Sequence, residues 1–251
     1  MLLGIMGAMP EEMDKIIAAI VDKTIVEKGS RLYYCGQLFG QDVVAVFSRW
    51  GKVAAATTVA NLILDFKVDR IVFTGVAGAI APDLNIGDIV IAQRLFQHDM
   101  DARPLMRRFE IPLTGKTSYE IPLQNIEILS QAVHNFLKKN KDFRHTLLEN
   151  GIIQPKMVVG DIASGDLFIS STDMKNALIK NLPSVVCAEM EGAAVAQVCD
   201  DYEVPLVVVR VISDSADEEA HVSATSFVNQ HAGDFSLLIL KEYIELINSK
   251  Q

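Results

Sequence analysis

Two glutamates one residue apart follow an apolar run in Ala188-Glu189-Met190-Glu191-Gly192. Carboxylates at the end of a buried strand lose hydration unless hydrogen-bond donors meet them, and the hydroxyl groups of a bound ligand are suitable donors. A solvated helix N-terminus would accommodate the same residues, because Glu191 could lie in the first helical turn. From this segment alone, a ligand site and a helix start fit about equally well.

A second pair of polar residues ends the apolar run that begins at Val207, in Arg210-Val211-Ile212-Ser213-Asp214. An arginine inside a β-branched strand needs an acidic partner if it is buried. Asp214 lies at the predicted strand tip, and ligands of open α/β sheets bind outside the carboxyl ends of the strands. We therefore expect Ser213 and Asp214 to face a ligand site.

The N-terminal segment GIMGAMPEE, residues 4–12, has the pattern of a strand, a turn and a helix start. Pro10 suits the first helical turn, and Glu11 and Glu12 complement the helix dipole. A glycine-containing loop that enters a helix often binds an anion, but neither GxGxxG nor GK[ST] is present here. Taken alone, this segment favours a purely structural role for the two glutamates.

Three further segments could contribute to a site, each with a more ordinary explanation. Phe168 could stack on a planar base, although such a residue is more often part of a core. The small residues of 74–79 could form a pocket floor or merely pack. His98-Asp99-Met100-Asp101 has no accompanying His/Cys cluster, so we predict no metal and no cofactor, and a structural or interface role for this segment.

Composition limits the class of protein. The chain has 251 residues, half of them hydrophobic, and a net charge of −9 that disfavours nucleic acid as a partner. Its apolar runs are too short for a membrane span, and no signal segment is apparent. The cysteines, Cys35, Cys187 and Cys199, form no CxxC pair. We expect reduced thiols, no membrane association and a cytoplasmic location.

The pattern of apolar segments predicts strands that alternate with helices, hence a parallel or mixed sheet covered on both faces. We predict one three-layer α/β domain over residues 1–251. The expected strands are 2–6, 31–38, 41–48, 70–74, 85–91, 157–162, 185–188 and 206–212, and the expected helices are 52–65, 124–138, 172–181, 191–201 and 223–248, with a further helix beginning at Pro10.

Residues 97–122 show no clear periodicity and contain Pro104, Pro112 and Pro122. A loop of this length within a compact domain is usually functional or a contact surface. Leu105, Met106 and Phe109 lie among arginines here, as interface residues often do. We therefore expect a homodimer with the 97–122 loop at or near its interface.

Together, in this order, the segments resemble the 5′-methylthioadenosine/S-adenosylhomocysteine nucleosidases of the purine nucleoside phosphorylase/uridine phosphorylase superfamily. The matching segments are GIMGAMPEE (4–12), GKVAAA (51–56), TGVAGA (74–79), GDIV (87–90), HDMD (98–101), SGDLFI (164–169), AEMEGAAVA (188–196) and RVISDSAD (210–217). The resemblance implies a nucleoside phosphorylase-like fold with a central twisted mixed sheet flanked by helices, and usually a homodimer with active sites near its interface.

By position, the resemblance implies that Glu12 is the general base for water and Asp214 the acid at purine N7. Met190 and Glu191 correspond to ribose contacts, and Phe168 and Ile169 to adenine contacts. The other positions expected to bind substrate are Met9, Trp50, Val76, Glu189, Arg210 and Ser213.

The implied enzyme is an N-glycosyl hydrolase that cleaves 5′-methylthioadenosine and S-adenosylhomocysteine, or also 5′-deoxyadenosine or 6-amino-6-deoxyfutalosine, to adenine and a 5′-modified ribose. An acid near the leaving base and a carboxylate near the attacking water suit the oxocarbenium-like transition state. The alternatives are a phosphate-dependent purine nucleoside phosphorylase and a non-catalytic adenosine-binding protein. A phosphorylase needs cations around its nucleophile, whereas Glu11 and Glu12 occupy this region.

Three positions depart from the family pattern. Val76 replaces a common serine near the water, Trp50 replaces a small aliphatic residue in the pocket for the 5′ substituent, and Ala224 replaces an aromatic that commonly closes that pocket. One large side chain gained and one lost predict a 5′ pocket of altered shape.

Overall fold

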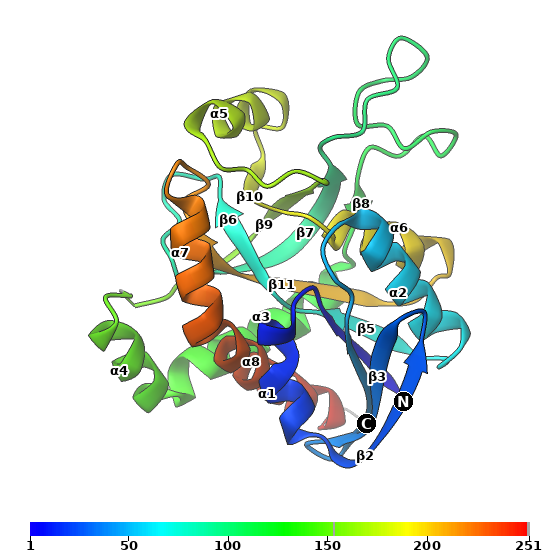
Figure 1. Ribbon diagram of the computed structural model, residues 1–251, viewed down its shortest axis with the longest axis vertical. Helices are drawn as coiled ribbons and strands as arrows, with labels where there is room; N and C mark the ends of the chain where they lie inside the picture. Colours follow the sequence, from blue (N-terminus) through cyan, green and yellow to red (C-terminus); the bar gives the residue numbers. More distant parts are fainter. Residues whose placement is uncertain (153, 250–251) are drawn as a thin grey trace.

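The computed structural model describes residues 1–152 and 154–249 (Figure 1). Its strands are β1 Leu3–Gly7, β2 Val21–Lys28, β3 Arg31–Leu38, β4 Gln41–Phe47, β5 Arg70–Phe73, β6 Val76–Ala79, β7 Ile89–Gln97, β8 Tyr119–Glu120, β9 Met157–Ser164, β10 Val185–Glu189 and β11 Leu206–Asp214. Its helices are α1 Pro10–Ala19, α2 Lys52–Leu64, α3 Leu123–Lys139, α4 Lys141–Glu149, α5 Thr172–Asn181, α6 Gly192–Asp201, α7 Ala220–Phe227 and α8 Gly233–Asn248, with a π-helical turn at Val228–Ala232.

The strands form one mixed sheet in the order β2-β3-β4-β1-β5-β11-β6-β10-β9-β7-β8. β1 pairs parallel with β4 and β5, and β11 pairs parallel with β5 and β6. Residues 209–211 of β11 also pair antiparallel with β7, so the second half of the sheet closes on itself. β11 therefore joins the two halves, and every one of its residues is buried.

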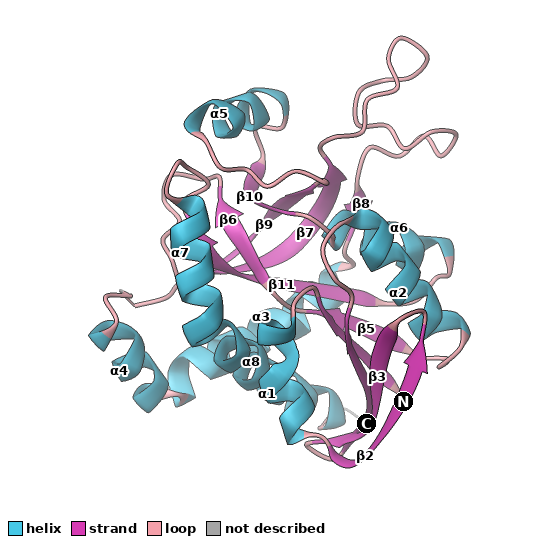
Figure 2. Cartoon of the chain, viewed as in Figure 1, coloured by secondary structure: helices cyan, strands magenta, loops and turns pink. Residues whose placement is uncertain are grey.

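Helices cover both faces of the first half of the sheet because the chain reverses its direction of travel across the strands. It passes from β1 to β4 on one side, and then through α2 to β5 on the other. Right-handed crossovers in opposite directions place their helices on opposite faces. Accordingly, α1 packs on α8, and α2 packs on α6 (Figures 1 and 2). The predicted three-layer α/β fold with a central mixed sheet is confirmed.

Most predicted elements form within one or two residues of the expected bounds, but the segments 85–91, 74–79 and 223–248 differ. The strand predicted at 85–91 begins only at Ile89, because the Asp88 carboxylate accepts the N–H groups of Asn85 (2.8 Å) and Lys156 (2.9 Å) and makes a turn of 85–88. Within 74–79, whose small residues were expected to form a pocket floor or to pack, Val76–Ala79 forms the strand β6. This short strand of small residues fits between β11 and β10.

The helix predicted at 223–248 is α7, the π-helical turn and α8, in direct succession. The prediction missed β2 and α4 entirely. Every residue of β2 is exposed, so this edge strand lacks the alternation that marks a strand with one buried face. A sequence pattern that depends on burial could not reveal it.

The 97–122 segment forms β8 at its end and is otherwise irregular. Leu105 is 87% exposed, as expected of a contact residue, whereas Phe109 packs in a small core with Ile80, Phe96 and Ile169. The expectation that Phe109 belongs to an interface is therefore wrong, because its ring completes the chain's own core. Over residues 1–152 and 154–249, no helix has the length and apolar character needed to span a membrane.

Candidate active site

The candidate site lies where β1, β4 and β11 end. These strands share one direction through their parallel pairings, so their carboxyl ends meet at one edge of the sheet. A cavity of about 970 Å³ opens there. Its lining includes most residues that the sequence predicted, namely Met9, Glu12, Trp50, Val76, Phe168, Glu189, Met190, Glu191, Ser213 and Asp214. Ile169 lines a narrower recess beside the cavity with Gly78 and Phe168.

Glu12 occupies the first turn of α1 and turns its carboxylate back toward the preceding loop. Its Oε2 accepts the N–H groups of Ala8 (2.7 Å) and Met9 (3.0 Å), and Oε1 accepts that of Val76 (3.0 Å). Gly75 lies against the same carboxylate, where a Cβ atom would come within 2.6 Å of Oε1. Burial raises the pKa of Glu12, while the Arg210 charge and the three N–H donors favour its ionised form.

Asp214 lines the cavity at the end of β11. Its Oδ1 accepts the Ala216 N–H at 2.9 Å, and the Ser213 hydroxyl donates to Oδ2 at 2.8 Å. Burial raises the pKa of Asp214, although these two hydrogen bonds oppose the rise. A carboxyl group with a raised pKa is suited to donate a proton near neutral pH.

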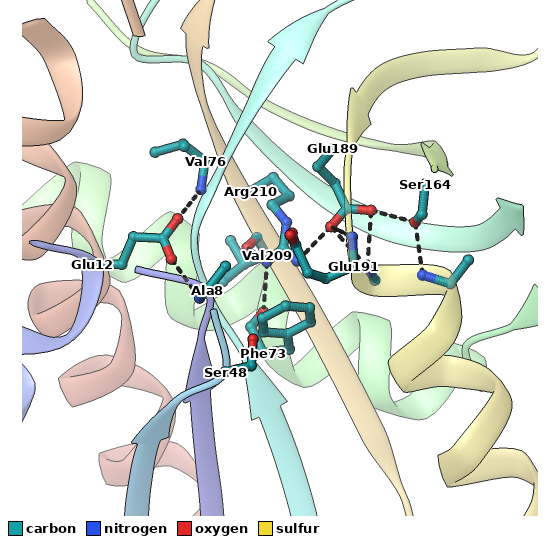
Figure 3. Close-up of polar contacts among 12 residues, drawn as sticks. Ala8, Glu12, Ser48, Phe73, Val76, Ser164, Glu189, Glu191, Val209 and Arg210 are labelled. Carbon is teal, nitrogen blue, oxygen red and sulfur yellow. Dashed lines mark hydrogen bonds and ion pairs between the residues drawn. The ribbon is translucent and has the colours of Figure 1, made fainter. Parts of the chain in front are cut away.

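Glu189 is held by the protein from several directions (Figure 3). Arg210 Nη2 lies 2.9 Å from its Oε2, the Ser164 hydroxyl donates to Oε1, and the N–H groups of Glu191 and Gly192 also donate to the carboxylate. The acidic partner that a buried Arg210 requires is therefore Glu189. Arg210 is only 1% exposed and lies behind Glu189, outside the cavity lining.

Arg210 makes its remaining contacts with the sheet. Its Nη1 donates to the carbonyl oxygens of Val209 (3.1 Å) and Phe73 (3.3 Å), and the guanidinium lies 4.0 Å from the centre of the Phe73 ring. All of these groups are buried, so the guanidinium is fixed in one orientation. It acts on the cavity through Glu189 and through its field.

Glu191 lies at the start of α6 and faces the N-terminus of α2. Its Oε1 accepts the Gly51 N–H at 2.8 Å. Burial, together with the neighbouring Glu189 charge, raises the pKa of Glu191 to about 8. A carboxylate this poorly solvated gains from hydroxyl donors on a ligand.

Several lining residues were not singled out from the sequence. Phe47 and Arg49 precede the predicted Trp50, and His221, Thr225, Val228 and Asn229 join the expected Ala224. The residues from His221 to Asn229 have the spacing of one helical face. This spacing could have indicated them if one face of the predicted C-terminal helix had been assigned to the site. Within residues 1–152 and 154–249, no cluster of three or more His, Cys, Asp or Glu side chains is arranged to hold a metal ion.

Comparisons with known proteins agree with this geometry. The sequence model of the phosphorylase superfamily matches residues 2–245, a range that contains the whole cavity lining. The chain is 34% identical to an aminodeoxyfutalosine nucleosidase of Helicobacter pylori, covering 92% of both proteins. It is also 34% identical to a 5′-methylthioadenosine/S-adenosylhomocysteine nucleosidase of Shewanella baltica, covering 99% of this chain and 98% of that protein.

A solved structure gives the same result. The S-adenosylhomocysteine nucleosidase of Streptococcus pyogenes, in complex with 5-methylthiotubericidin, aligns with a TM-score of 0.84 at 33% identity and covers 98% of this chain and 96% of that chain. The similarity therefore extends over the whole fold.

Replacing Glu191 by glutamine is expected to weaken the pH dependence of stability. The pKa of Glu191 rises from 4.5 to about 8 on folding, so the stability associated with its protonated form is complete below the lower value and is lost as the pH rises through the upper one. Between roughly pH 5 and pH 8, unliganded wild type should lose about 1.4 kcal/mol or more relative to Glu191→Gln, the equivalent of one pH unit or more. Urea unfolding of both proteins at each pH measures this difference, and parallel pH profiles would contradict it.

Proposed function

The chain belongs to the phosphorylase superfamily, and within that family we propose that it hydrolyses the bond between adenine and a 5′-modified ribose. The resemblance predicted from the sequence motifs is confirmed by the full-length relatives, which are named as nucleosidases. The observation that carries the proposal is one cavity with two buried carboxyl groups: Glu12, which has the Arg210 charge and three N–H donors nearby, and Asp214, which has two hydrogen-bond donors.

The two carboxyl groups divide the proton transfers between them. Asp214, in its protonated form, donates to N7 of the leaving adenine, and Glu12 accepts a proton from the attacking water. The water oxygen bonds to C1′ as the C1′–N9 bond breaks, so the products are adenine and the free sugar. Acid catalysis at the leaving group and base catalysis at the nucleophile together suit an oxocarbenium-like transition state.

The remaining lining residues account for binding of the nucleoside. Phe168 and Ile169 flank the recess beside Asp214, where the adenine ring would lie between apolar surfaces. Glu191 and Met190 hold the ribose, with the Glu191 carboxylate accepting its 2′ and 3′ hydroxyl groups. The negative charge of Glu191 and Glu189 also stabilises the positive charge that develops on the sugar.

Water, rather than phosphate, is the proposed nucleophile. A phosphate dianion needs cationic side chains and free N–H donors at its site. The charge of Arg210 acts on Glu12, but its guanidinium is already bound by Glu189 and two carbonyl oxygens. Arg49, which lines the cavity, donates to the Ser30 carbonyl oxygen. The N–H groups of Ala8 and Met9, in the loop before α1, are likewise bound by Glu12.

The proposed substrates are 5′-methylthioadenosine and S-adenosylhomocysteine, with 5′-deoxyadenosine and 6-amino-6-deoxyfutalosine as further candidates. The relatives named for methylthioadenosine and for aminodeoxyfutalosine have equal identity to this chain, 34%. Trp50 and Ala224 both line the cavity, and the resemblance to the family assigns both positions to the pocket for the 5′ substituent. Because Trp50 is larger and Ala224 smaller than the residues common at these positions in the family, the space for the 5′ substituent has a different shape.

We further propose a homodimer in the cytoplasm, with the 97–122 loop near the interface and part of it covering the partner's 5′ pocket. Leu105 and Leu113 are 87% and 92% exposed and supply apolar surface that a partner subunit would cover. Buried Cys187 and Cys199, both free thiols, suit a reducing compartment.

The function is tested by chromatographic detection of adenine from 5′-methylthioadenosine, with and without phosphate. We expect equal rates and a free sugar as product. A requirement for phosphate, with a sugar 1-phosphate as product, would instead identify a phosphorylase. Tight binding without adenine release would identify a binding protein.

Replacing either member of the acid and base pair should nearly abolish turnover. Asp214→Asn and Glu12→Gln are each expected to lower kcat by about 10²–10⁴-fold, the usual contribution of a positioned acid or base. Asp14→Asn, an exposed carboxylate on the same helix as Glu12, is the control and should retain wild-type kcat. Wild-type rates in both site variants would refute these roles.

Trp50 should select among 5′ substituents. Its ring lies at the cavity but is 66% exposed, so it can contact a large substituent more fully than a methylthio group. Trp50→Val is expected to lower kcat/KM for S-adenosylhomocysteine about five- to tenfold more than for 5′-methylthioadenosine, the value of one aromatic contact. The ratio of the two constants is its own control, and an unchanged ratio would exclude Trp50 from this role.

The dimer is tested by sedimentation equilibrium at micromolar concentration. Wild type should have twice the chain mass of 27.6 kDa. Leu105→Asp should shift the equilibrium toward monomer because it places a charge in an apolar contact, whereas Leu148→Asp, another exposed leucine on α4, should not. A wild-type protein of monomer mass would refute the proposal.

A further inference from the structure

The segment His98-Asp99-Met100-Asp101, which has no role in the reaction described above, meets two other loops beside the active site. One is the start of α2, at Gly51 and Lys52, and the other is the loop after β9 that contains Asp166. Each of these two loops also carries lining residues, Trp50 on the first and Phe168 on the second. The contacts among the three segments therefore determine how two walls of the cavity lie relative to each other.

Two carboxylates bind the N-terminus of α2. The Gly51 N–H donates to Glu191 Oε1 at 2.8 Å, and the next N–H, that of Lys52, donates to Asp166 Oδ1 at 2.8 Å. Free N–H groups and the positive end of the helix dipole favour negative charge at this position. Glu191 and Asp166 are thus neighbours at one helix start, although they come from different elements.

Asp99 contacts both the start of α2 and the loop that contains Asp166. Its Oδ1 lies 2.6 Å from Lys52 Nζ, and its Oδ2 accepts the Asp166 N–H at 2.9 Å. Lys52 Nζ also donates to Gln97 Oε1 at 3.2 Å. Although burial alone would raise the pKa of Asp99, the hydrogen bonds from Lys52 and Asp166 hold it below its usual value, so the carboxylate stays charged.

Close packing leaves these loops little freedom. A Cβ atom on Gly51 would lie 3.0 Å from Asp166 Oδ1, and the residue has φ +94°, a conformation that favours glycine. On the other loop, the His98 imidazole lies against Gly165 so closely that no Cβ atom could fit. The segments are therefore in direct contact.

We propose that Lys52, Asp99 and Asp166 form a latch of positioning residues, which aligns the ribose-binding Glu191 with the adenine-binding loop that carries Phe168. This inference rests on the proposed function of the same cavity. The latch fixes the N-terminus of α2, and that helix start fixes Glu191 through the Gly51 N–H. Through Asp99 and Asp166, the same residues fix the loop that ends in Phe168 and Ile169.

The latch has a specific electrostatic consequence. The Gly51 N–H is a donor that favours the ionised form of Glu191 against the effects of burial and of Glu189. When Asp166 no longer holds the Lys52 N–H, the helix start can move away and that donor weakens. Glu191 then needs a higher pH to ionise, so as the pH falls the ribose loses its charged acceptor at a higher pH than in wild type.

The test compares Asp166→Ala and Lys52→Met with Asp166→Asn, which keeps an oxygen acceptor for the Lys52 N–H. The matched control is Lys28→Met, which removes an ion pair with Asp65 at the opposite end of α2. For each full-length protein, kcat, KM and the pH profile of kcat/KM are measured with 5′-methylthioadenosine, together with the melting temperature.

Asp166→Ala and Lys52→Met are expected to raise KM about tenfold, the effect of losing a hydrogen bond to a charged group. The acid limb of kcat/KM should move to higher pH, and kcat should change less than KM because Glu12 and Asp214 lie outside the latch. Asp166→Asn should restore most of the wild-type KM, and Lys28→Met should match wild type throughout. If Asp166→Ala does not fold, Lys52→Met and Asp166→Asn still supply the comparison.

Three results would overturn the latch. They are wild-type KM and pH profile in both latch variants, a lower melting temperature with no change in KM or pH profile, and the same changes in Lys28→Met. Failure of the proposed function is distinguishable, because wild type itself would then release no adenine. In that case calorimetric Kd values for 5′-methylthioadenosine should show the same tenfold weakening in the latch variants, and equal Kd values would refute it.

Discussion

The buried ion pair between Arg210 and Glu189 is the interaction on which the rest of the site depends. It joins the middle of β11 to the end of β10. The Glu189 carboxylate also accepts hydrogen bonds from the Ser164 hydroxyl of β9 and from two N–H groups at the start of α6. Removing one partner of such a pair costs about 3–5 kcal/mol, because the other charge is left buried. The ion pair thus fixes the ends of the strands and, with them, the backbone of Glu191 at the start of α6.

This arrangement concentrates negative charge in a poorly solvated cavity. Burial raises the pKa of Glu12, Glu191 and Asp214, so the unliganded protein is stabilised by leaving part of this charge neutralised. A sugar that becomes positive in the transition state relieves the same repulsion. The features that disfavour the empty site at neutral pH are therefore those that suit the proposed reaction.

Residues at strand ends could be predicted from the sequence because the first polar residue after a run of apolar residues marks the end of a buried strand. Ser213, Asp214 and Glu189 were found in this way. Burial patterns could not reveal β2, which has no buried face, or the contact of Phe109 with the chain's own core. Nor could they reveal the contacts of Lys52, Asp99 and Asp166, which join residues 47, 67 and 114 positions apart and exist only once the strands are aligned.

The sequence allowed two interpretations of Glu12, Glu189 and Glu191, as charges that stabilise a helix start or as residues of a ligand site. In the structure the same carboxylates bind backbone N–H groups and line the cavity. Glu12 accepts two N–H groups of the loop before α1, Glu189 accepts those at the start of α6, and Glu191 accepts one at the start of α2. Helix N-termini of this kind commonly bind phosphate. Here the protein's own carboxylates accept these N–H groups, which both anchors the carboxylates proposed to act on the substrate and removes the donors that an attacking phosphate would require. The proposed selection of water over phosphate thus follows from how these carboxylates bind the backbone, and a phosphorylase made from this chain would need those N–H groups released as well as cations added.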